Sequence, residues 1–306
     1  MGEQICGGFY FWEGWKSWVE ILFLFLTNNK IKPVEDKIID WLNKTGYPLE
    51  LWTESILSKN SFIVTNSTLY KDAENDIFRE IDLKATRTWA TEEYDIVFAL
   101  ELIIECKKSD KPFILLCNED SENKQISIGS YYGLSDPIIA MLLNNSNTKI
   151  ELPQESNAGF KLIQGFVNGD ETINKATNAL IKSYNDARNN EFEFIQHYID
   201  DNYNSIILPI LVIDAPFFEL KTNINNELKL KKIESGILNI STNLSKYYPE
   251  PFEIPIVTKL GFIELMNKIQ KFGDQNIEFL IQNPTLNISN FKNVNLAVKE
   301  IEETNN

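Results

Sequence analysis

Apolar residues recur every three or four positions in two segments that begin the regular part of the chain. Residues 33–46 start with a proline, carry acidic residues in the first turn and end at a glycine, which together predict a helix. A second helix is expected over residues 48–59, where Glu50 and Glu54 share one side, four positions apart. The apolar side of this second helix consists of Leu49, Trp52, Ile56 and Leu57.

The hydrophobic pattern then changes to a period of two. Residues 61–70 and 77–85 alternate between apolar and polar side chains, and the polar stretch between them predicts a hairpin turn. Residues 95–107 form a third, strongly apolar strand. Because successive strand residues point to opposite sides, Asp82 lies on the polar side of the second strand, and Glu105 and Lys107 share one side of the third.

The same patterns predict the remaining elements of an α/β domain. Residues 111–117 are expected to form a fourth strand, in a hairpin with the preceding one, or the start of a crossover. Residues 118–170 are expected to form an irregular polar insertion with a short helix near 137–143. The later elements are a helix over 173–199, a buried strand over 205–220, a hairpin over 227–241, and a strand followed by a closing helix over 251–272.

Three parts are distinguished along the chain. Residues 1–31 form an aromatic-rich extension, for which we expect an extra helix, and residues 32–292 form the α/β domain. Residues 293–306 form a polar, acidic tail. The apolar run Val19–Leu26 is too short to span a bilayer, and neither a basic segment nor a cleavage site marks a signal peptide, so no membrane partner is expected.

Composition narrows the classes of function. The net charge of −15 counts against a protein that binds nucleic acid over a broad surface, so nucleic-acid binding would need a local basic patch or metal ions. The single histidine, His197, excludes His-rich zinc sites and lies in an expected helix without a nucleophile motif elsewhere. The three cysteines are interpreted as free thiols in a reducing cytoplasm.

Asp82, Glu105 and Lys107 form the candidate chemical group. Neighbouring strands would bring the two carboxylates to one edge of the sheet with an amine beside them, a type of oxygen-ligand set that Mg²⁺ prefers. A bound Mg²⁺ lowers the pKa of its water, and a nearby lysine can orient that water. Alternating acidic and basic residues on a solvated strand explain each residue equally well when it is taken alone.

Several short motifs, in this order, resemble the PD-(D/E)xK, or restriction-endonuclease-like, nucleases. They are "GYPLE" at 46–50, "REIDL" at 79–83, "ELIIECK" at 101–107, "KP" at 111–112 and "LPILVIDAP" at 208–216. The resemblance covers mainly residues 46–117. It implies a mixed central sheet flanked by helices, with a helical extension at the N-terminus. One departure from the family pattern is Ile81, which stands where the family has proline.

The resemblance also implies roles for individual residues. Asp82, Glu105 and Glu50 would ligate Mg²⁺ or Mn²⁺, Lys107 would position the attacking water, and Glu54 is an alternative to Glu50. The nearest further cations, which could hold phosphates or simply add solubility, are Lys84, Arg87, Lys108 and Lys111.

The implied activity is that of a metal-dependent endonuclease acting on DNA, with RNA left open. A role in prokaryotic defence and a homodimer or a recruiting protein partner follow by family analogy. The alternative is a non-catalytic binding or assembly module on the same fold.

Overall fold

The computed structural model describes residues 33–91, 96–118, 158–169, 171–198, 203–222, 225, 227–240 and 252–282. The chain divides into two compact units, residues 1–45 and 46–306. In the first unit, helix α2 (Val34–Leu42) begins after Pro33 and has Glu35 and Asp36 in its first turn, as the sequence predicted. The expected helix within residues 1–31 and the tail 293–306 lie outside the described residues.

The second unit is built on one ten-stranded sheet with parallel and antiparallel pairs, which confirms the prediction of an α/β protein with a mixed sheet. The strands follow one another across the sheet in the order β1-β2-β3-β6-β10-β9-β5-β4-β7-β8. Their bounds are β1 Ile63–Asp72, β2 Ile77–Thr91, β3 Ile96–Lys108, β4 Phe113–Cys117, β5 Ala158–Gln164, β6 Tyr203–Asp214, β7 Phe217–Thr222, β8 Leu228–Lys232, β9 Ser235–Ile240 and β10 Phe252–Thr258.

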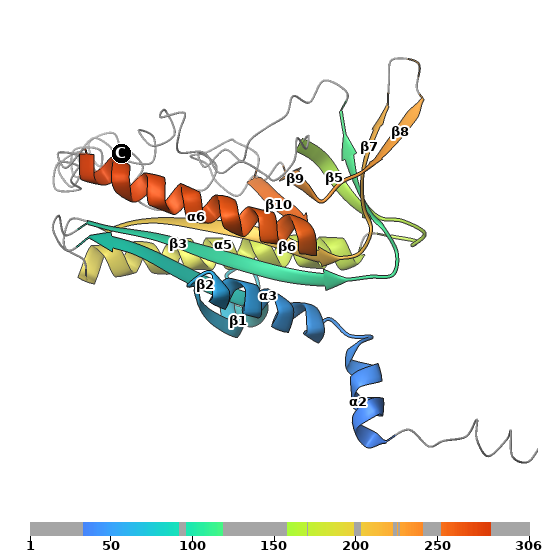
Figure 1. Cartoon of the computed structure of the whole chain (residues 1–306), viewed down its shortest axis with the longest axis horizontal. Coiled ribbons are helices and arrows are strands. Elements are labelled where there is room, and N and C mark those ends of the chain that lie inside the picture. Colours follow the sequence, from blue (N-terminus) through green and yellow to red (C-terminus); the bar gives the residue numbers. More distant parts are fainter. Residues whose placement is uncertain are drawn as a thin grey trace, which may run out of the picture. The chain divides into compact units, whose positions relative to one another are not determined.

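Helices cover both sides of this sheet (Figure 1). Helix α6 (Lys259–Gln282) packs on one side, where Phe272 meets Phe98 of β3 with 5.9 Å between the ring centroids. Helix α3 (Tyr47–Lys59) lies on the same side, because its Trp52 contacts Phe262 of α6. Helix α5 (Glu171–Tyr198) packs on the opposite side against β1, β3 and β6. None of the described helices is long and apolar enough to cross a membrane.

Strand β3 lies at the centre of the region that carries the candidate residues. It pairs with β2 in antiparallel orientation and with β6 in parallel orientation, so its backbone is bonded along both edges. Leu102, Ile103 and Ile104 are each fully buried, although neighbouring residues point to opposite sides. A strand covered on both sides reads as a continuous apolar run, which explains the pattern of residues 95–107 in the sequence.

Four sequence predictions in the later part of the chain are wrong. Strands β3 and β4 do not form a hairpin, since β6, β10, β9 and β5 lie between them, and the predicted hairpin over 227–241 is replaced by pairing of β8 with β7. The strand expected over 205–220 divides at Ala215 and Pro216 into β6 and β7. Strand β5 was missed within the expected irregular insertion, of which residues 119–157 lie outside the described chain, as does the predicted short helix near 137–143.

Candidate functional site

The antiparallel ladder between β2 and β3 ends at the pair Leu83 and Ile104, one position before Asp82 and Glu105. Beyond that point, Oδ2 of Asp82 accepts a hydrogen bond of 2.7 Å from the backbone N–H of Cys106. A side chain therefore takes the place of the next backbone contact between the strands. This bond fixes the Asp82 carboxylate beside the end of β3.

Lys107 lies between the two carboxylates of the candidate group. Its ammonium contacts Oε1 of Glu105, donates a hydrogen bond of 3.0 Å to the backbone carbonyl of Cys106, and lies 3.9 Å from Oδ2 of Asp82. The Glu105 residue is only 7% exposed, whereas about a fifth of the Asp82 side chain is accessible. The structure thus brings Asp82, Glu105 and Lys107 together in a partly buried group that solvent can reach. We call these three residues the acidic-lysine cluster.

Helix α3 carries the two glutamates considered from the sequence, and their surroundings differ. The pKa of Glu50 responds to the charges of Asp82 and Lys107, which places its carboxyl within electrostatic range of the cluster. Glu54 instead accepts a hydrogen bond of 3.0 Å from Asn66 of β1. Between them on the helix, Thr53 is buried with its hydroxyl 3.7 Å from Sγ of Cys106, so this turn of α3 packs on the end of β3.

Burial is the largest cause of the pKa shifts of all three carboxyls. It raises the pKa of Glu105 to about 7, with the Lys107 charge opposing the rise and the Asp82 charge adding to it. Burial also raises the pKa values of Asp82 and Glu50 above their ordinary values. For Lys107, burial lowers the pKa, but the charges of Glu105 and Asp82 outweigh it and the net shift is upward. The group therefore gathers negative charge in a place where water solvates it poorly.

Glu105 is expected to make the folded chain less stable as the pH rises. Its pKa is raised from 4.5 to about 7, so between these values the folded chain holds a proton that the unfolded chain releases, and stability falls with increasing pH. This fall amounts to at most about 3 kcal/mol in the free energy of unfolding, and we expect Glu105→Gln to remove it. Urea denaturation in EDTA at about pH 5 and about pH 8 measures it. Glu54→Gln is the control and should keep the fall. An equal fall in Glu105→Gln and Glu54→Gln would contradict the assignment of this pH dependence to Glu105.

The resemblance implies a divalent metal. The side chains present fit a metal ion that is held by two protein carboxylates. The Lys107 ammonium already places a positive charge beside both carboxylates, and the contacts described above engage only Oδ2 of Asp82 and Oε1 of Glu105. The second oxygen of each can ligate a cation, and Mg²⁺ is commonly held by one or two carboxylates with waters and phosphate oxygens. Within the described ranges, no group of three or more His, Cys, Asp or Glu side chains could hold a metal, so a ligand role for Glu50 stays a prediction.

The four nearby cations considered from the sequence do not gather at the cluster. Lys84 pairs with Glu101 at 2.8 Å, and Arg87 donates a 2.8 Å hydrogen bond to the carbonyl of Asn60. Lys111 donates to the carbonyl of Phe166 at 3.1 Å. Lys108 lines a cavity beside the cluster.

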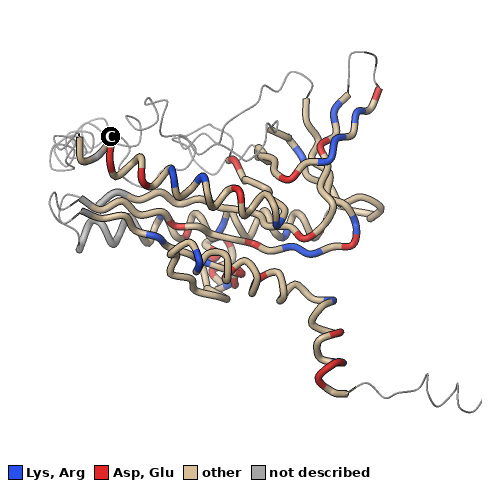
Figure 2. The backbone as a smooth tube through the Cα atoms, in the orientation of Figure 1, with Lys and Arg blue, Asp and Glu red and all other residues tan. Residues whose placement is uncertain are grey.

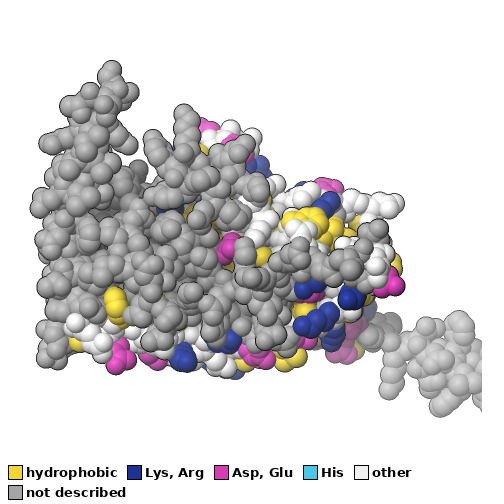
Figure 3. All heavy atoms as spheres, turned by 90° about the horizontal axis from the view of Figure 1, so that it is seen from above, with side chains coloured by type: hydrophobic (Ala, Val, Ile, Leu, Met, Phe, Trp, Pro, Cys, Tyr) yellow, Lys and Arg dark blue, Asp and Glu magenta, His cyan; other side chains and the backbone are white. Residues whose placement is uncertain are grey.

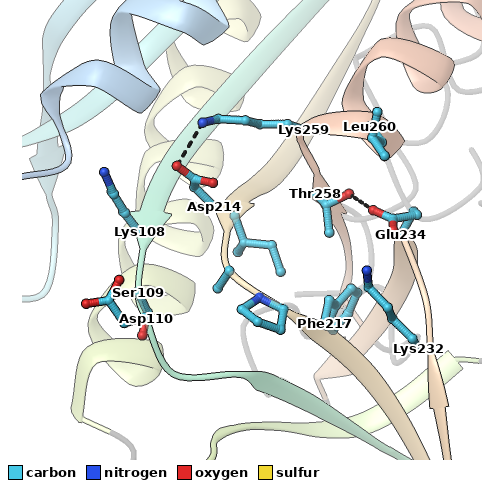
Figure 4. A pocket seen from close by; sticks show the side chains of 13 residues that line it. Lys108, Ser109, Asp110, Asp214, Phe217, Lys232, Glu234, Thr258, Lys259 and Leu260 are labelled. Carbon is cyan, nitrogen blue, oxygen red and sulfur yellow. Dashed lines mark hydrogen bonds and ion pairs between the residues drawn. The ribbon is translucent and has the colours of Figure 1, made fainter. Parts of the chain in front are cut away.

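That cavity was not predicted from the sequence. It lies where β3, β6 and β10 end, has a volume of about 530 Å³, and is lined among others by Lys108, Asp214, Lys232, Glu234, Thr258 and Lys259 (Figure 4). We call it the strand-end cavity. Its residues are scattered from 108 to 260, and their meeting depends on the parallel pairing of three strands. The signal in the sequence that could have indicated the cavity is a charged residue at the carboxyl end of each of these apolar strands, Lys108 for β3, Asp214 for β6 and Lys259 for β10.

Comparison of the chain with protein-family models, curated proteins and solved structures found no match.

Proposed function

We propose that this protein is a metal-dependent nuclease that hydrolyses phosphodiester bonds in DNA at the acidic-lysine cluster. The observation that carries the proposal is the meeting of Asp82, Glu105 and Lys107 where the ladder between β2 and β3 ends. These are the residues for which the sequence resemblance implies ligand and water-positioning roles. An exposed charged strand would not require the carboxylates to be buried around a single ammonium.

The arrangement of elements supports the restriction-endonuclease-like interpretation. Helix α3 is followed by the antiparallel strands β1, β2 and β3, and α5 then leads to β6, which is parallel to β3. This succession puts the strand that carries Asp82 next to the strand that carries Glu105 and Lys107. It also places the preceding helix, with Glu50, over the same strand ends.

Each residue of the cluster has a chemical task in the proposed reaction. Asp82 and Glu105 would hold the Mg²⁺ ion, which when bound lowers the pKa of water and offsets charge on the phosphate. The fixed ammonium of Lys107 orients the attacking water and stabilises the charge that develops as the phosphodiester bond breaks. Burial raises the pKa of Glu105, and this favours an arrangement in which a cation shares the site.

The excess of acidic residues requires that basic groups act locally. Figure 2 shows basic residues on the hairpin of β7 and β8 and at the end of β3, and those at the end of β3 follow the cluster directly in the chain. In Figure 3, lysine and arginine side chains lie beside aspartate and glutamate, and the described part of this face carries no broad basic field. We therefore expect modest, salt-sensitive binding of the substrate strand.

Removal of the metal tests the proposal. The protein is incubated with plasmid DNA, single-stranded DNA or RNA, in Mg²⁺, in Mn²⁺ or in EDTA, and the products are separated on gels. We expect cleavage of at least one DNA substrate with either metal and none in EDTA. Cleavage that continues in EDTA, or no cleavage of any substrate, would contradict the proposal, and the latter result would favour a binding or assembly module.

A further inference from the structure

The strand-end cavity lies at the carboxyl ends of three strands that run parallel to one another, β3, β6 and β10. Ligands of open α/β sheets bind outside the carboxyl ends of the strands. Its volume of about 530 Å³ falls within the range of sites for small molecules, roughly 300–1,000 Å³. The size and the location both match those of small-molecule sites in α/β proteins.

The start of helix α6 forms one wall of this cavity and is held firmly in place. Thr258 donates a hydrogen bond to the Glu234 carboxylate, while its hydroxyl oxygen accepts one of 3.3 Å from the N–H of Gly261. A side chain at Gly261 would place Cβ 2.1 Å from the carbonyl oxygen of Glu234, so only glycine permits this approach. The N-terminal end of α6, where the helix dipole is positive, is therefore held in place in the cavity wall before any ligand binds.

Three lysines line the cavity, together with the acidic residues Asp110, Asp214 and Glu234. Lys259 is fixed by an ion pair of 2.8 Å with Asp214, and its ammonium lies 5.8 Å from the ring centre of Trp52. Figure 4 shows Lys108 and Lys232 at opposite margins of the cavity. Among the residues that the structure describes, Lys232 makes no ion pair. Apolar side chains, Phe217 and Leu260, complete the lining.

The cavity and the acidic-lysine cluster share the end of β3. Lys107 belongs to the cluster and Lys108 to the cavity, because neighbouring strand residues point to opposite sides. Glu105 and Lys108 are three positions apart, which corresponds to about 10 Å along a strand. Nucleotides in a duplex rise by roughly 3.4 Å per strand position, so this separation along β3 corresponds to about three nucleotides of a substrate strand that passes around the strand end from one side of the sheet to the other.

We propose that the strand-end cavity binds one nucleotide of the substrate strand, with its phosphate at Lys232 and its sugar and base against the apolar lining. This inference rests on the proposed nuclease function, since it assigns the ligand from the proximity of the cluster. The cavity would hold the strand in position, and the cluster would carry out the chemistry.

Binding measured without cleavage tests the proposal. The probe is a fluorescein-labelled single-stranded DNA of about twelve nucleotides, titrated in EDTA at several salt concentrations and followed by fluorescence anisotropy. We expect Lys232→Gln to weaken binding and to reduce the slope of log K against log[salt] by about 0.7, the loss of one phosphate contact to a single strand. Asp110→Asn removes an exposed acidic group at the margin and is expected to tighten binding.

Lys271→Gln is the matched control. Lys271 is exposed on α6, twelve positions beyond Lys259 and thus about 18 Å along the helix. The substitution removes the same charge as Lys232→Gln but at a residue outside the cavity lining, so we expect an unchanged slope of log K against log[salt]. Equal effects of Lys232→Gln and Lys271→Gln, no effect of either, or no binding of the probe at all would overturn the nucleotide site.

Two further arms separate the sources of the phosphate and the two proposals. If Lys232→Gln also weakens binding of circular single-stranded DNA, the bound phosphate is internal. If Lys232→Gln weakens binding only of strands with a terminal phosphate, the bound phosphate is at a chain end. Either result supports the nucleotide site. Selective weakening by Lys232→Gln in a protein that cleaves no nucleic acid would retain the nucleotide site and remove the nuclease function.

Discussion

Replacement of Lys107 by methionine should reduce metal-dependent DNA cleavage by at least about a hundredfold, because it removes a fixed charge at the reacting phosphate. Methionine retains much of the length of the side chain but cannot donate to Glu105 or offset negative charge. Asp82→Asn should have an effect of similar size through loss of a metal-ligand charge. The measurement is the single-turnover rate of cleavage of a labelled DNA in Mg²⁺, together with the melting temperature of each variant.

Matched variants separate catalysis from general changes in charge. Lys175→Met removes an exposed lysine on α5 that pairs with Glu171, and should leave the rate unchanged. Glu50→Gln should slow cleavage by about tenfold or more, whereas Glu54→Gln, at a residue bonded to Asn66, should not. Wild-type rates for a folded Lys107→Met protein would refute the role assigned to that lysine.

The second large effect is on stability, at Asp72. This carboxylate at the end of β1 is fully buried and accepts hydrogen bonds from Arg79 at 2.8 Å, Asn75 at 2.9 Å and Lys182 at 3.0 Å. Lys182 belongs to α5, so the contact fastens the β1–β2 hairpin to that helix. Asp72→Asn removes the charge that Arg79 and Lys182 share and leaves Lys182 only its exposed pair with Glu74 at 2.6 Å, and we expect the melting temperature to fall by more than about 5 °C.

The pH dependence of this effect has a defined sign. The hydrogen bond from Asn75, followed by those from Lys182 and Arg79, lowers the pKa of Asp72 below its ordinary value of 3.8. A carboxyl with a lowered pKa stabilises the folded chain above its unfolded pKa, and this contribution is lost as the pH falls below about 3.8 towards the folded pKa. The difference in melting temperature between wild type and Asp72→Asn should therefore narrow in that acid range.

Asp76→Asn provides the control for Asp72. Asp76 pairs with Lys71 at 2.9 Å, but its side chain is 83% exposed, and exposed pairs contribute little to stability. Its backbone has a positive φ of 52°, which asparagine tolerates well. Equal losses in the two variants would show that Asp72 does not fasten the hairpin to α5.

Local periodicity was sufficient to predict the elements around the cluster. Helix α3 and strands β1, β2 and β3 appear where the hydrophobic pattern placed them, and the two-residue period of side-chain direction along β2 and β3 correctly put Asp82 beside Glu105 and Lys107. The choice between Glu50 and Glu54 needed the helix rotation. Helical spacing defined one shared side for both residues but not that Glu54 bonds to Asn66 while Glu50 lies in electrostatic range of the cluster.

Features that depend on distant pairing could not be predicted in the same way. Strand β4 follows β3 in sequence, yet it pairs with β5 and β7, and no local signal distinguishes a hairpin from a crossing to another part of the sheet. The role of Asp72 could not be predicted because Lys182 lies 110 residues away in the sequence. Local pattern places Asp72 in the polar stretch that predicts a hairpin turn. The strand-end cavity likewise exists only after three strands have come together.

The most direct test of the central claim is a crystal structure of the protein soaked in Mn²⁺, with an anomalous difference map. We predict an anomalous peak within about 2.5 Å of carboxylate oxygens from both Asp82 and Glu105, with the Lys107 ammonium still in contact with Glu105. A well-diffracting crystal in which Mn²⁺ binds elsewhere, or does not bind between these two carboxylates, would contradict the account.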